Sequence, residues 1–339
     1  DIKERFFMKN RYLAHSEIKI TVKKIEKLKI PLTIFEVLTL IYIINASKID
    51  VDYNLTECGA LWEKDSVNVF DFPFMQVVTN INLQHKNFLK IKTLNEVIYQ
   101  DVGFLSNFSK IYISKQTPYV LKKIRKHLKK NRSLITYPNE WGLVKNKKGY
   151  YYQDKNTKIK INTKNIHSKG LLENLCHAIK IALDLKISKR VIEKTIPRLI
   201  FIGRFQYLKK GKIKNKLHKN EKLMIDGAHA TTDAKNLASY LKTIKLPKYG
   251  IWSMTKNKEP DLFIKQLKYV FKKIVTIPIE KENSSVSANE LHRIALMNKI
   301  NSEEGNNFMD ALKKISNKEK KLIVCFGSLY NCGNILNKN

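Results

Sequence analysis

Four short polar stretches, each following an apolar run, hold the residue types in this sequence that could do chemistry. The first stretch spans residues 56–59 and contains Glu57 next to Cys58 and Gly59. A carboxylate in such a place suits Mg²⁺, a hard cation that binds carboxylate, water and phosphate oxygens. A solvated loop glutamate is the alternative interpretation.

The second stretch, residues 82–85, ends with His85. A neutral imidazole can bind a metal ion through a ring nitrogen, and the alternative is an ordinary loop histidine. In the third stretch, residues 226–229, Asp226 could accept hydrogen bonds from a ribose, while Gly227 lets the backbone approach a ligand closely. A turn capped by the aspartate is the alternative there. The fourth stretch, residues 327–330, begins with Gly-Ser and predicts either an anion-binding or packing turn or a simple strand-to-helix turn.

The elements that must position these residues follow from the hydrophobic pattern. Short apolar runs alternate with helical patterns, which predicts an α/β fold with parallel strands. Ligands bind such folds at the carboxyl ends of strands, where the four stretches fall. The expected strands span residues 51–56, 75–79, 110–114, 222–225, 248–253, 273–279 and 321–326, and the expected helices span 34–45, 175–185, 234–241, 260–271 and 288–298.

Three further features refine this prediction. Residues 34–45 are apolar nearly all round, which predicts a buried helix. Residues 149–162 are polar, aromatic and β-rich, and predict a meandering hairpin at a sheet edge. Pro197 interrupts the pattern before a new strand–helix series, so we expect two domains, residues 1–197 and 198–339.

The charge and the cysteines narrow the function classes. The 64 basic and 30 acidic residues give a formal charge of +34, but only eight of the basic residues are arginines. Lysines lie along the whole chain with much Ile and Asn, which favours an AT-rich genome over a nucleic-acid binder, whose charge is concentrated and rich in Arg. The four cysteines form no CxxC pair and predict reduced thiols in the cytoplasm. The longest apolar run, residues 37–44, is too short to cross a bilayer, so we expect no membrane partner.

Taken in order, these stretches and several others resemble the folylpolyglutamate synthase and dihydrofolate synthase family, relatives of the Mur ligases. The resemblance runs from about Glu4 to Ile335. Residues 33–36 are similar to the family's T-x-F-E helix start, and residues 57–68 to E-V-G-L-G-G-R-L-D-A-T-N. Gln84-His85 stands where the family has D-H. The remaining matches are residues 203–206 to G-R-F-[EQ], 226–229 to D-G-A-H, 258–259 to K-D and 327–330 to G-S-L-Y.

The resemblance implies a fold and a set of roles. The fold would be a P-loop-NTPase-like Mur ligase central domain, followed by a smaller Rossmann-like Mur ligase C-terminal domain. The implied roles are Mg²⁺ binding by Glu57, His85 and Asp101, ATP binding by Arg204, Asp226 and Asn174, catalysis by His229 and Lys258, and substrate binding by Thr33 and Glu36. The last two would lie near the pterin or at the start of the apolar helix.

The sequence also departs from the family pattern. The family's P-loop, G-T-N-G-K-G-S, is absent, so we expect an N-terminally truncated fragment that is inactive alone and whose first sheet lacks a strand. Asp101 stands at a lysine that is often carbamylated in the family; it keeps the negative charge, and a surface aspartate is the alternative. Leu61 and Trp62 replace two glycines of G-L-G-G, and Ala230 replaces the asparagine of D-G-A-H-N.

The reaction implied by the resemblance is ATP-dependent addition of L-glutamate to a folate or to dihydropteroate, through an acyl phosphate and with Mg²⁺. The family resemblance also implies a monomer. A Mur-type ligase acting on another acid and a degenerate, non-catalytic homologue are the alternatives. The sequence does not distinguish dihydrofolate synthesis from extension of a polyglutamate tail.

Overall fold

The computed structural model describes residues 2–83, 91–128, 134–136 and 139–339. The chain divides into two compact units, Asp1–Tyr137 and Pro138–Asn339. The domain boundary expected after residue 197 stays a prediction, and it falls inside the second compact unit.

The first unit begins with a small helical layer. A 3-10 turn η1 (Ile2–Arg5) and a hairpin of β1 (Phe7–Met8) and β2 (Arg11–Tyr12) precede α1 (His15–Glu26) and α2 (Ile34–Ala46). These elements bury a core around Phe6, Leu13, Ile18, Ile25 and Ile41.

Helix α2 begins and ends close to where the sequence predicts, but burial on all its sides is not observed. In its first turn Ile34 and Phe35 are 63% and 51% exposed. Tyr42 Oη donates to Asn54 Oδ1 at 2.8 Å, and Thr39 Oγ1 donates to Ser66 Oγ at 2.8 Å, so the loop after the helix covers its middle and leaves the first turn uncovered.

A parallel sheet forms the rest of the first unit. Its strands β3 (Met75–Val78), β4 (Lys110–Ile113) and β5 (Leu134–Thr136) pair in that order. Helices α3 (Leu94–Val102) and α4 (Pro118–His127) bury Ile98 and Ile124 against it. The prediction of strands at 75–79 and 110–114 is confirmed. The strand expected at 51–56 is wrong: these residues form a loop in which Tyr53 and Leu55 are 48% and 87% exposed, so their alternating pattern has no core to face.

The second unit opens with an antiparallel sheet of β6 (Trp141–Asn146), β7 (Gly149–Asp154) and β8 (Lys158–Ile161). This confirms the predicted hairpin at 149–162, but the expected place at a sheet edge is wrong, since β7 and β8 form a sheet of their own with β6. Helices α5 (Lys169–Asp184) and α6 (Lys189–Thr195) follow, and the turn η2 (Ile196–Arg198) contains Pro197.

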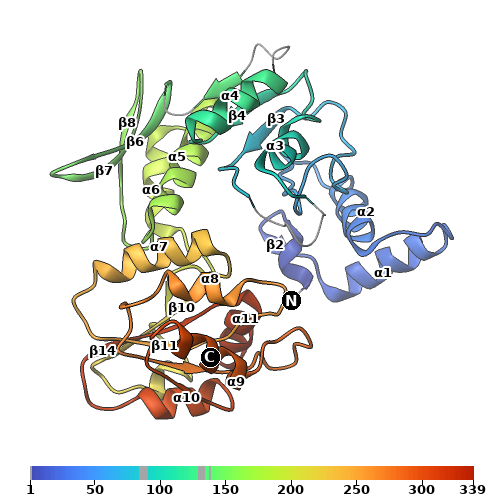
Figure 1. The fold of residues 1–339 in the computed structure, drawn as a ribbon. Coiled ribbons are helices and arrows are strands. Elements are labelled where there is room, and N and C mark those ends of the chain that lie inside the picture. The colour runs from blue at the N-terminus through green and yellow to red at the C-terminus, as the bar shows by residue number, and fades with distance from the viewer. Residues whose placement is uncertain (1, 84–90, 129–133, 137–138) are drawn as a thin grey trace. The chain divides into compact units, whose positions relative to one another are not determined.

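A six-stranded sheet carries the remainder of the second unit (Figure 1). All its neighbouring strands are parallel except β9, which runs antiparallel to β10. In spatial order the strands are β13 (Ser302–Glu304), β12 (Lys273–Thr276), β11 (Lys248–Trp252), β14 (Lys321–Phe326), β10 (Glu221–Asp226) and β9 (Gln206–Tyr207). The strands predicted at 222–225, 248–253, 273–279 and 321–326 are thereby confirmed, which supports the α/β class.

Helices cover both faces of this sheet because its central strands alternate their apolar side chains between two cores. Met224 of β10 points into one core, and its neighbours Leu223 and Ile225 point into the other. The first core is closed by α7 (Thr231–Lys242), α8 (Pro260–Lys265) and α9 (Ala288–Met297). The second is closed by α10 (Phe308–Ile315), α11 (Leu329–Lys338) and the two residues that flank the turn η3 (Lys214–Lys216), Ile213 and Leu217. Helix α8 is shorter than the predicted 260–271, since Tyr269 takes a left-handed φ of 64° in the turns that follow it.

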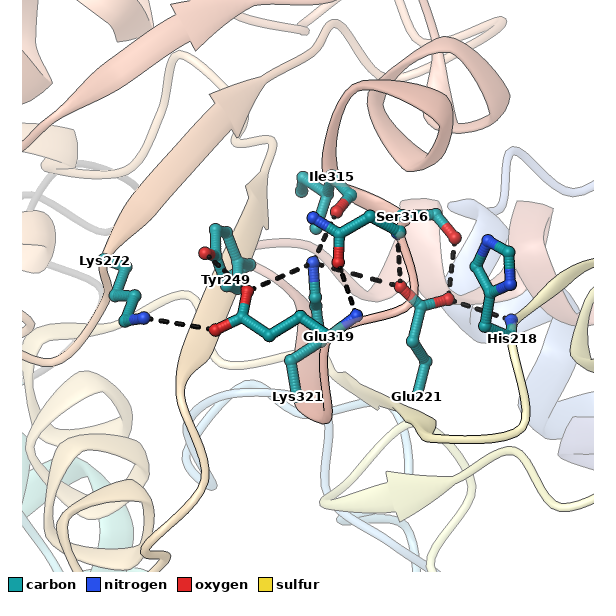
Figure 2. A network of polar contacts seen from close by, with 9 residues as sticks. His218, Glu221, Tyr249, Lys272, Ile315, Ser316, Glu319 and Lys321 are labelled. Carbon is teal, nitrogen blue, oxygen red and sulfur yellow. Dashed lines mark hydrogen bonds and ion pairs between the residues drawn. The ribbon is translucent and has the colours of Figure 1, made fainter.

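A buried ionic network fixes the amino ends of the central strands. Glu221 and Lys321 are register partners in β10 and β14, and both side chains are fully buried. Lys321 Nζ donates to the carbonyl of Ile315 at 2.8 Å and lies 4.0 Å from Glu221 Oε1 and 3.7 Å from Glu319 Oε2 (Figure 2). Asp226 and Phe326 are register partners at the opposite, carboxyl ends of the same two strands.

None of the helices in the described ranges is long and apolar enough to cross a lipid bilayer.

Candidate functional site

Asp226 is the last residue of β10 and the most buried of the predicted site residues. Its side chain is 2% exposed. Oδ2 accepts the backbone amide of Phe205 at 2.8 Å, and Oδ1 accepts the amide of Ala228 at 2.8 Å. Burial raises the pKa of this carboxyl to about 6, against the opposing effects of the two amides and of nearby Arg204.

The loop that brings Phe205 to Asp226 needs a left-handed backbone at two positions. Gly203 has φ of 66° and Phe205 has φ of 47°. The amide of Gly203 donates to Gln206 Oε1 at 2.8 Å, and its carbonyl accepts the amide of Gly227 at 2.6 Å. The G-R-F-Q and D-G-A-H motifs therefore form one hydrogen-bonded unit, which presents Arg204 beside the end of β10.

Two glycines make room for this arrangement. A Cβ on Gly227 would lie 2.2 Å from Leu329 Cδ2, so the G-S-L-Y leucine packs directly on the D-G-A-H turn. Gly327 has φ of 105°, and a Cβ there would lie 2.1 Å from the carbonyl oxygen of Ser253. The G-S-L-Y stretch is thus a closely packed turn that joins β14 to α11, and anion binding by it stays a prediction. Ser328 caps α11 by accepting the amide of Asn331.

His229 lies near charges of both signs, since Asp233, Lys258 and Arg204 all act on it. Its Nδ1 is 2.8 Å from the carbonyl oxygen of Gly227. Since a carbonyl can only accept, Nδ1 carries the proton and the neutral ring keeps a lone pair on Nε2. Burial lowers the pKa of His229, the Gly227 carbonyl and the charge of Asp233 oppose this, and the positive charges of Lys258 and Arg204 act in the same direction as burial. The structure therefore brings Lys258 and Arg204 within electrostatic reach of His229.

Asn174 lies on α5, in the same compact unit, and is exposed. Helix α5 is tied to the rest of the unit through the loop before it. The ring of His167 stacks on Tyr240 of α7 with centroids 5.1 Å apart and meets Tyr207 of β9 edge-on at 5.5 Å. These contacts fix the helix, while the role of Asn174 in ATP binding stays a prediction.

In the first unit Glu57 opens a loop held together by Asp65. The carboxylate of Asp65 accepts the amide of Gly59 at 2.7 Å, the thiol of Cys58 at 3.3 Å and the amide of Val67 at 3.0 Å. Glu57 itself is exposed. Burial, mainly, and then the charge of Asp65 raise the pKa of the Cys58 thiol to about 12.

Asp101, in the last turn of α3, lies near this loop. Its charge acts on the Cys58 thiol, and its own pKa is raised to about 6 by burial. Glu57 and Asp101 offer hard oxygen donors, and the protonated thiol of Cys58 does not compete with them, so the donor set fits Mg²⁺. No cluster of three acidic, histidine or cysteine side chains occurs among the residues that the structure describes. Mg²⁺ needs none, because it keeps several waters and uses one or two protein carboxylates together with substrate phosphates. His85 lies outside the described residues.

Thr33 and Glu36 form a capping box at the start of α2. The amide and hydroxyl of Thr33 donate to Glu36 Oε2 at 2.6 and 2.7 Å, and Thr33 Oγ1 accepts the amide of Glu36 at 3.4 Å. The hydroxyl of Thr33 is the main cause that lowers the pKa of Glu36. The expected position at the helix start is confirmed, and contact with a pterin stays a prediction.

Several residues of the site were missed by sequence reasoning. Phe205 contributes through its backbone amide, which no side-chain pattern reveals. Asp233 accepts the amides of His229 and Ala230 at 3.2 Å each, and its position three residues after Ala230 is a recognisable capping signal. The cap also shows that Ala230, where the family has asparagine, still begins a well-formed α7.

Comparison with known proteins supports the fold. Residues 209–338 match the family model described as "Dihydrofolate synthetase, C-terminal domain". No curated protein sequence matches the chain. Among solved structures, FolC of Escherichia coli in complex with DHPP and ADP has a TM-score of 0.82 at 19% identity, covering 97% of this chain and 76% of that chain.

Two further structures give the same picture. A bifunctional folylpolyglutamate synthase/dihydrofolate synthase from Yersinia pestis, complexed with AMPPNP and Mn ion, has a TM-score of 0.83 at 17% identity and covers 99% of this chain and 78% of that one. Folylpolyglutamate synthase from Thermotoga maritima has a TM-score of 0.77 at 18% identity, with coverage of 97% and 77%.

The chain therefore has the α/β fold of the folylpolyglutamate and dihydrofolate synthases, as its motifs predicted. Within it, residues 209–338 are similar to the dihydrofolate synthetase C-terminal domain family.

Proposed function

We propose that the product of the complete gene is an ATP-dependent ligase that adds L-glutamate to a folate or to dihydropteroate. One observation carries the proposal. In the second compact unit, buried Asp226 accepts hydrogen bonds that hold the G-R-F-Q loop against the D-G-A-H turn. The solved structures of this fold support it, since their ligands include DHPP with ADP, and Mn with AMPPNP and L-glutamate.

The chemistry that we propose proceeds in two steps. The acceptor carboxylate attacks the γ-phosphorus of ATP, so that ADP leaves and an acyl phosphate forms. The amine of L-glutamate then attacks the acyl carbon, loses a proton, and inorganic phosphate leaves as the amide forms. Both steps bring anions together, so positive side chains close to the reacting groups lower the barrier.

The residues of the second unit take separate parts in this scheme. Asn174 and Asp226 bind the nucleoside of ATP, and Asp226 can do so because each carboxylate oxygen retains a lone pair after accepting one backbone amide. Arg204 contacts phosphate. Lys258 and His229 serve the second substrate: Lys258 offers a positive charge to a carboxylate, and the free Nε2 of His229 can accept a proton.

In the first unit, Glu57, Asp101 and His85 would hold Mg²⁺. Bound there, the ion would neutralise phosphate charge. In this role neither Glu57 nor Asp101 has to gain or lose a proton during the reaction. Thr33 and Glu36 are proposed to lie beside the pterin in addition to capping α2. We also propose that the protein is a monomer in the cytoplasm and has no nucleic-acid partner.

Phosphate release tests this function. The complete gene product is incubated with Mg²⁺-ATP, L-glutamate and either dihydropteroate or tetrahydrofolate, and with each component omitted in turn. We expect release that requires both L-glutamate and one of the two acceptors. If folded protein releases no phosphate with either acceptor, the proposal is contradicted. Release with a different acid would identify a ligase of that acid instead.

A matched pair of lysines tests the site. Lys258 is half-buried and acts on His229, whereas Lys256 is exposed two positions away. We expect Lys258→Ala to lower kcat/KM for L-glutamate about 100-fold, the usual loss when one transition-state contact is removed. Lys256→Ala should leave it unchanged. Equal effects of the two substitutions on kcat/KM would show that Lys258 has no specific role in the site.

A further inference from the structure

Trp62 ties the loop that begins at Glu57 to the end of helix α3. Its indole Nε1 donates to the carbonyl oxygen of Phe104 at 3.1 Å, a contact that spans 42 positions in the sequence. Phe104 follows α3, whose last turn contains Asp101. The indole is half-buried, so this hydrogen bond is partly shielded from water.

The same residue organises the loop from within. The carbonyl of Trp62 accepts the amide of Asp65 at 3.2 Å and the side-chain amide of Asn68 at 3.1 Å. Asp65 in turn accepts the amide of Gly59 and the thiol of Cys58. An unbroken chain of hydrogen bonds therefore runs from the end of α3, through Trp62 and Asp65, to the residue next to Glu57.

The neighbouring residue adds an apolar anchor. Leu61 packs against the core of the three-stranded sheet, which includes Ile98 of α3 and Ile113 of β4. Glycines at positions 61 and 62, as in the family pattern that this stretch resembles, could make neither the indole hydrogen bond nor this contact. Glycine would also raise the conformational entropy that the loop loses on ordering.

We propose that Trp62 is a positioning residue that holds the Glu57–Asn68 loop, and with it Glu57, against the end of α3, whose last turn carries Asp101. This inference rests on the proposed function, in which these two carboxylates bind Mg²⁺. Trp62 acts through the loop backbone and touches no reacting atom. Its removal should therefore weaken the metal site while leaving the chemistry at saturating metal intact.

Trp62→Phe is the sharpest variant, because it keeps an aromatic ring while removing the N–H donor together with the second ring of the indole. In the complete gene product we expect the Mg²⁺ concentration for half-maximal phosphate release to rise about fivefold, the worth of one net hydrogen bond. The kcat at saturating Mg²⁺ should stay near that of the wild type. Trp62→Gly should raise the Mg²⁺ requirement further. Trp252→Phe is the control, since Trp252 Nε1 has no partner among the described residues and lies in the core of the second unit.

Hydrogen exchange gives a second readout that needs neither metal nor activity. In the metal-free protein the amides of Gly59 and Val67, which donate to Asp65, should exchange faster in Trp62→Phe than in the wild type and in Trp252→Phe. Unchanged exchange and an unchanged Mg²⁺ requirement in both Trp62 variants would overturn this inference. A wild-type protein with no phosphate release would instead overturn the proposed function.

Discussion

Asp226 accepts the backbone amide of Phe205 at 2.8 Å, across 21 positions of sequence. One carboxylate thereby joins the end of a central strand to the loop that carries Arg204. The carboxylate is buried, and water cannot replace the hydrogen bond. The geometry of the proposed ATP site therefore depends on Asp226 as much through the backbone as through any ligand contact.

The raised pKa of Asp226 predicts a pH dependence of stability. Because its pKa is about 6 in the folded protein and 3.8 ordinarily, the folded state keeps a proton that the unfolded chain has lost between these values. The stability contributed by this group is therefore full at low pH and falls as pH rises toward the folded pKa, by about 3 kcal/mol in all. Urea unfolding of wild type and Asp226→Asn should show the wild-type advantage shrinking over this range. A constant difference would contradict the burial of a titrating carboxyl.

The contact between Gly227 and Leu329 predicts a coupled pair of substitutions. Gly227→Ala places a Cβ against the leucine and should lower the free energy of unfolding by about 1–3 kcal/mol. In a Leu329→Ala background the obstructing atoms are gone, so Gly227→Ala should cost much less. Gly333→Ala, in α11 with open space around it, should be neutral or stabilising by up to about 1 kcal/mol. Simple additivity of the first two substitutions would show that the two residues do not meet.

The buried network at the amino ends of the strands predicts a large asymmetry between two lysines (Figure 2). Lys321→Met leaves the carboxylate of Glu221 buried without its cation and should cost about 3–5 kcal/mol of unfolding free energy. Lys272 pairs with Glu319 at 3.2 Å on the exposed side of the network, so Lys272→Ala should cost less than about 1 kcal/mol. Chemical denaturation measures both. Similar costs would mean that Lys321 gains little from its partners.

The capping box of α2 predicts a separable effect on stability. Thr33→Ala removes the hydroxyl that accepts the amide of Glu36 and should lower the unfolding free energy by about 1 kcal/mol. Thr33→Ser keeps that hydroxyl and should restore most of the loss. If Thr33 also touches the acceptor, the KM for the acceptor will change in the alanine variant and recover in the serine variant. If Thr33→Ser lowers the unfolding free energy as much as Thr33→Ala does, the hydroxyl does not cap the helix.

Sequence patterns predicted best where one physical signal dominates. Strand β14 was predicted with both of its ends correct because six consecutive buried residues lie between turn signals. The segment 51–56 misled because alternation of apolar and polar residues marks a strand only when one face is covered, and here Tyr53 and Leu55 face outward. Helix α3 was not predicted, although a threonine cap and Glu96 mark its start.

The candidate site shows the same division. The motifs identified Asp226, His229 and Arg204, because side-chain type and spacing carry their chemistry. They could not reveal that Phe205 contributes an amide, or that the charge of Asp101 reaches Cys58, since both depend on tertiary contacts. In the sequence Trp62 is only a departure from the family pattern. Its proposed positioning role depends on its hydrogen bond to Phe104, which the sequence does not reveal.

The most direct test of the proposed reaction follows oxygen atoms. An acceptor, dihydropteroate or tetrahydrofolate, carrying heavy oxygen in its carboxylate is incubated with ATP, L-glutamate and the complete gene product. We expect a product with one added glutamate, and inorganic phosphate that carries one heavy oxygen from the acceptor. Phosphate without the label, or no glutamate added to either acceptor, would contradict the proposed reaction.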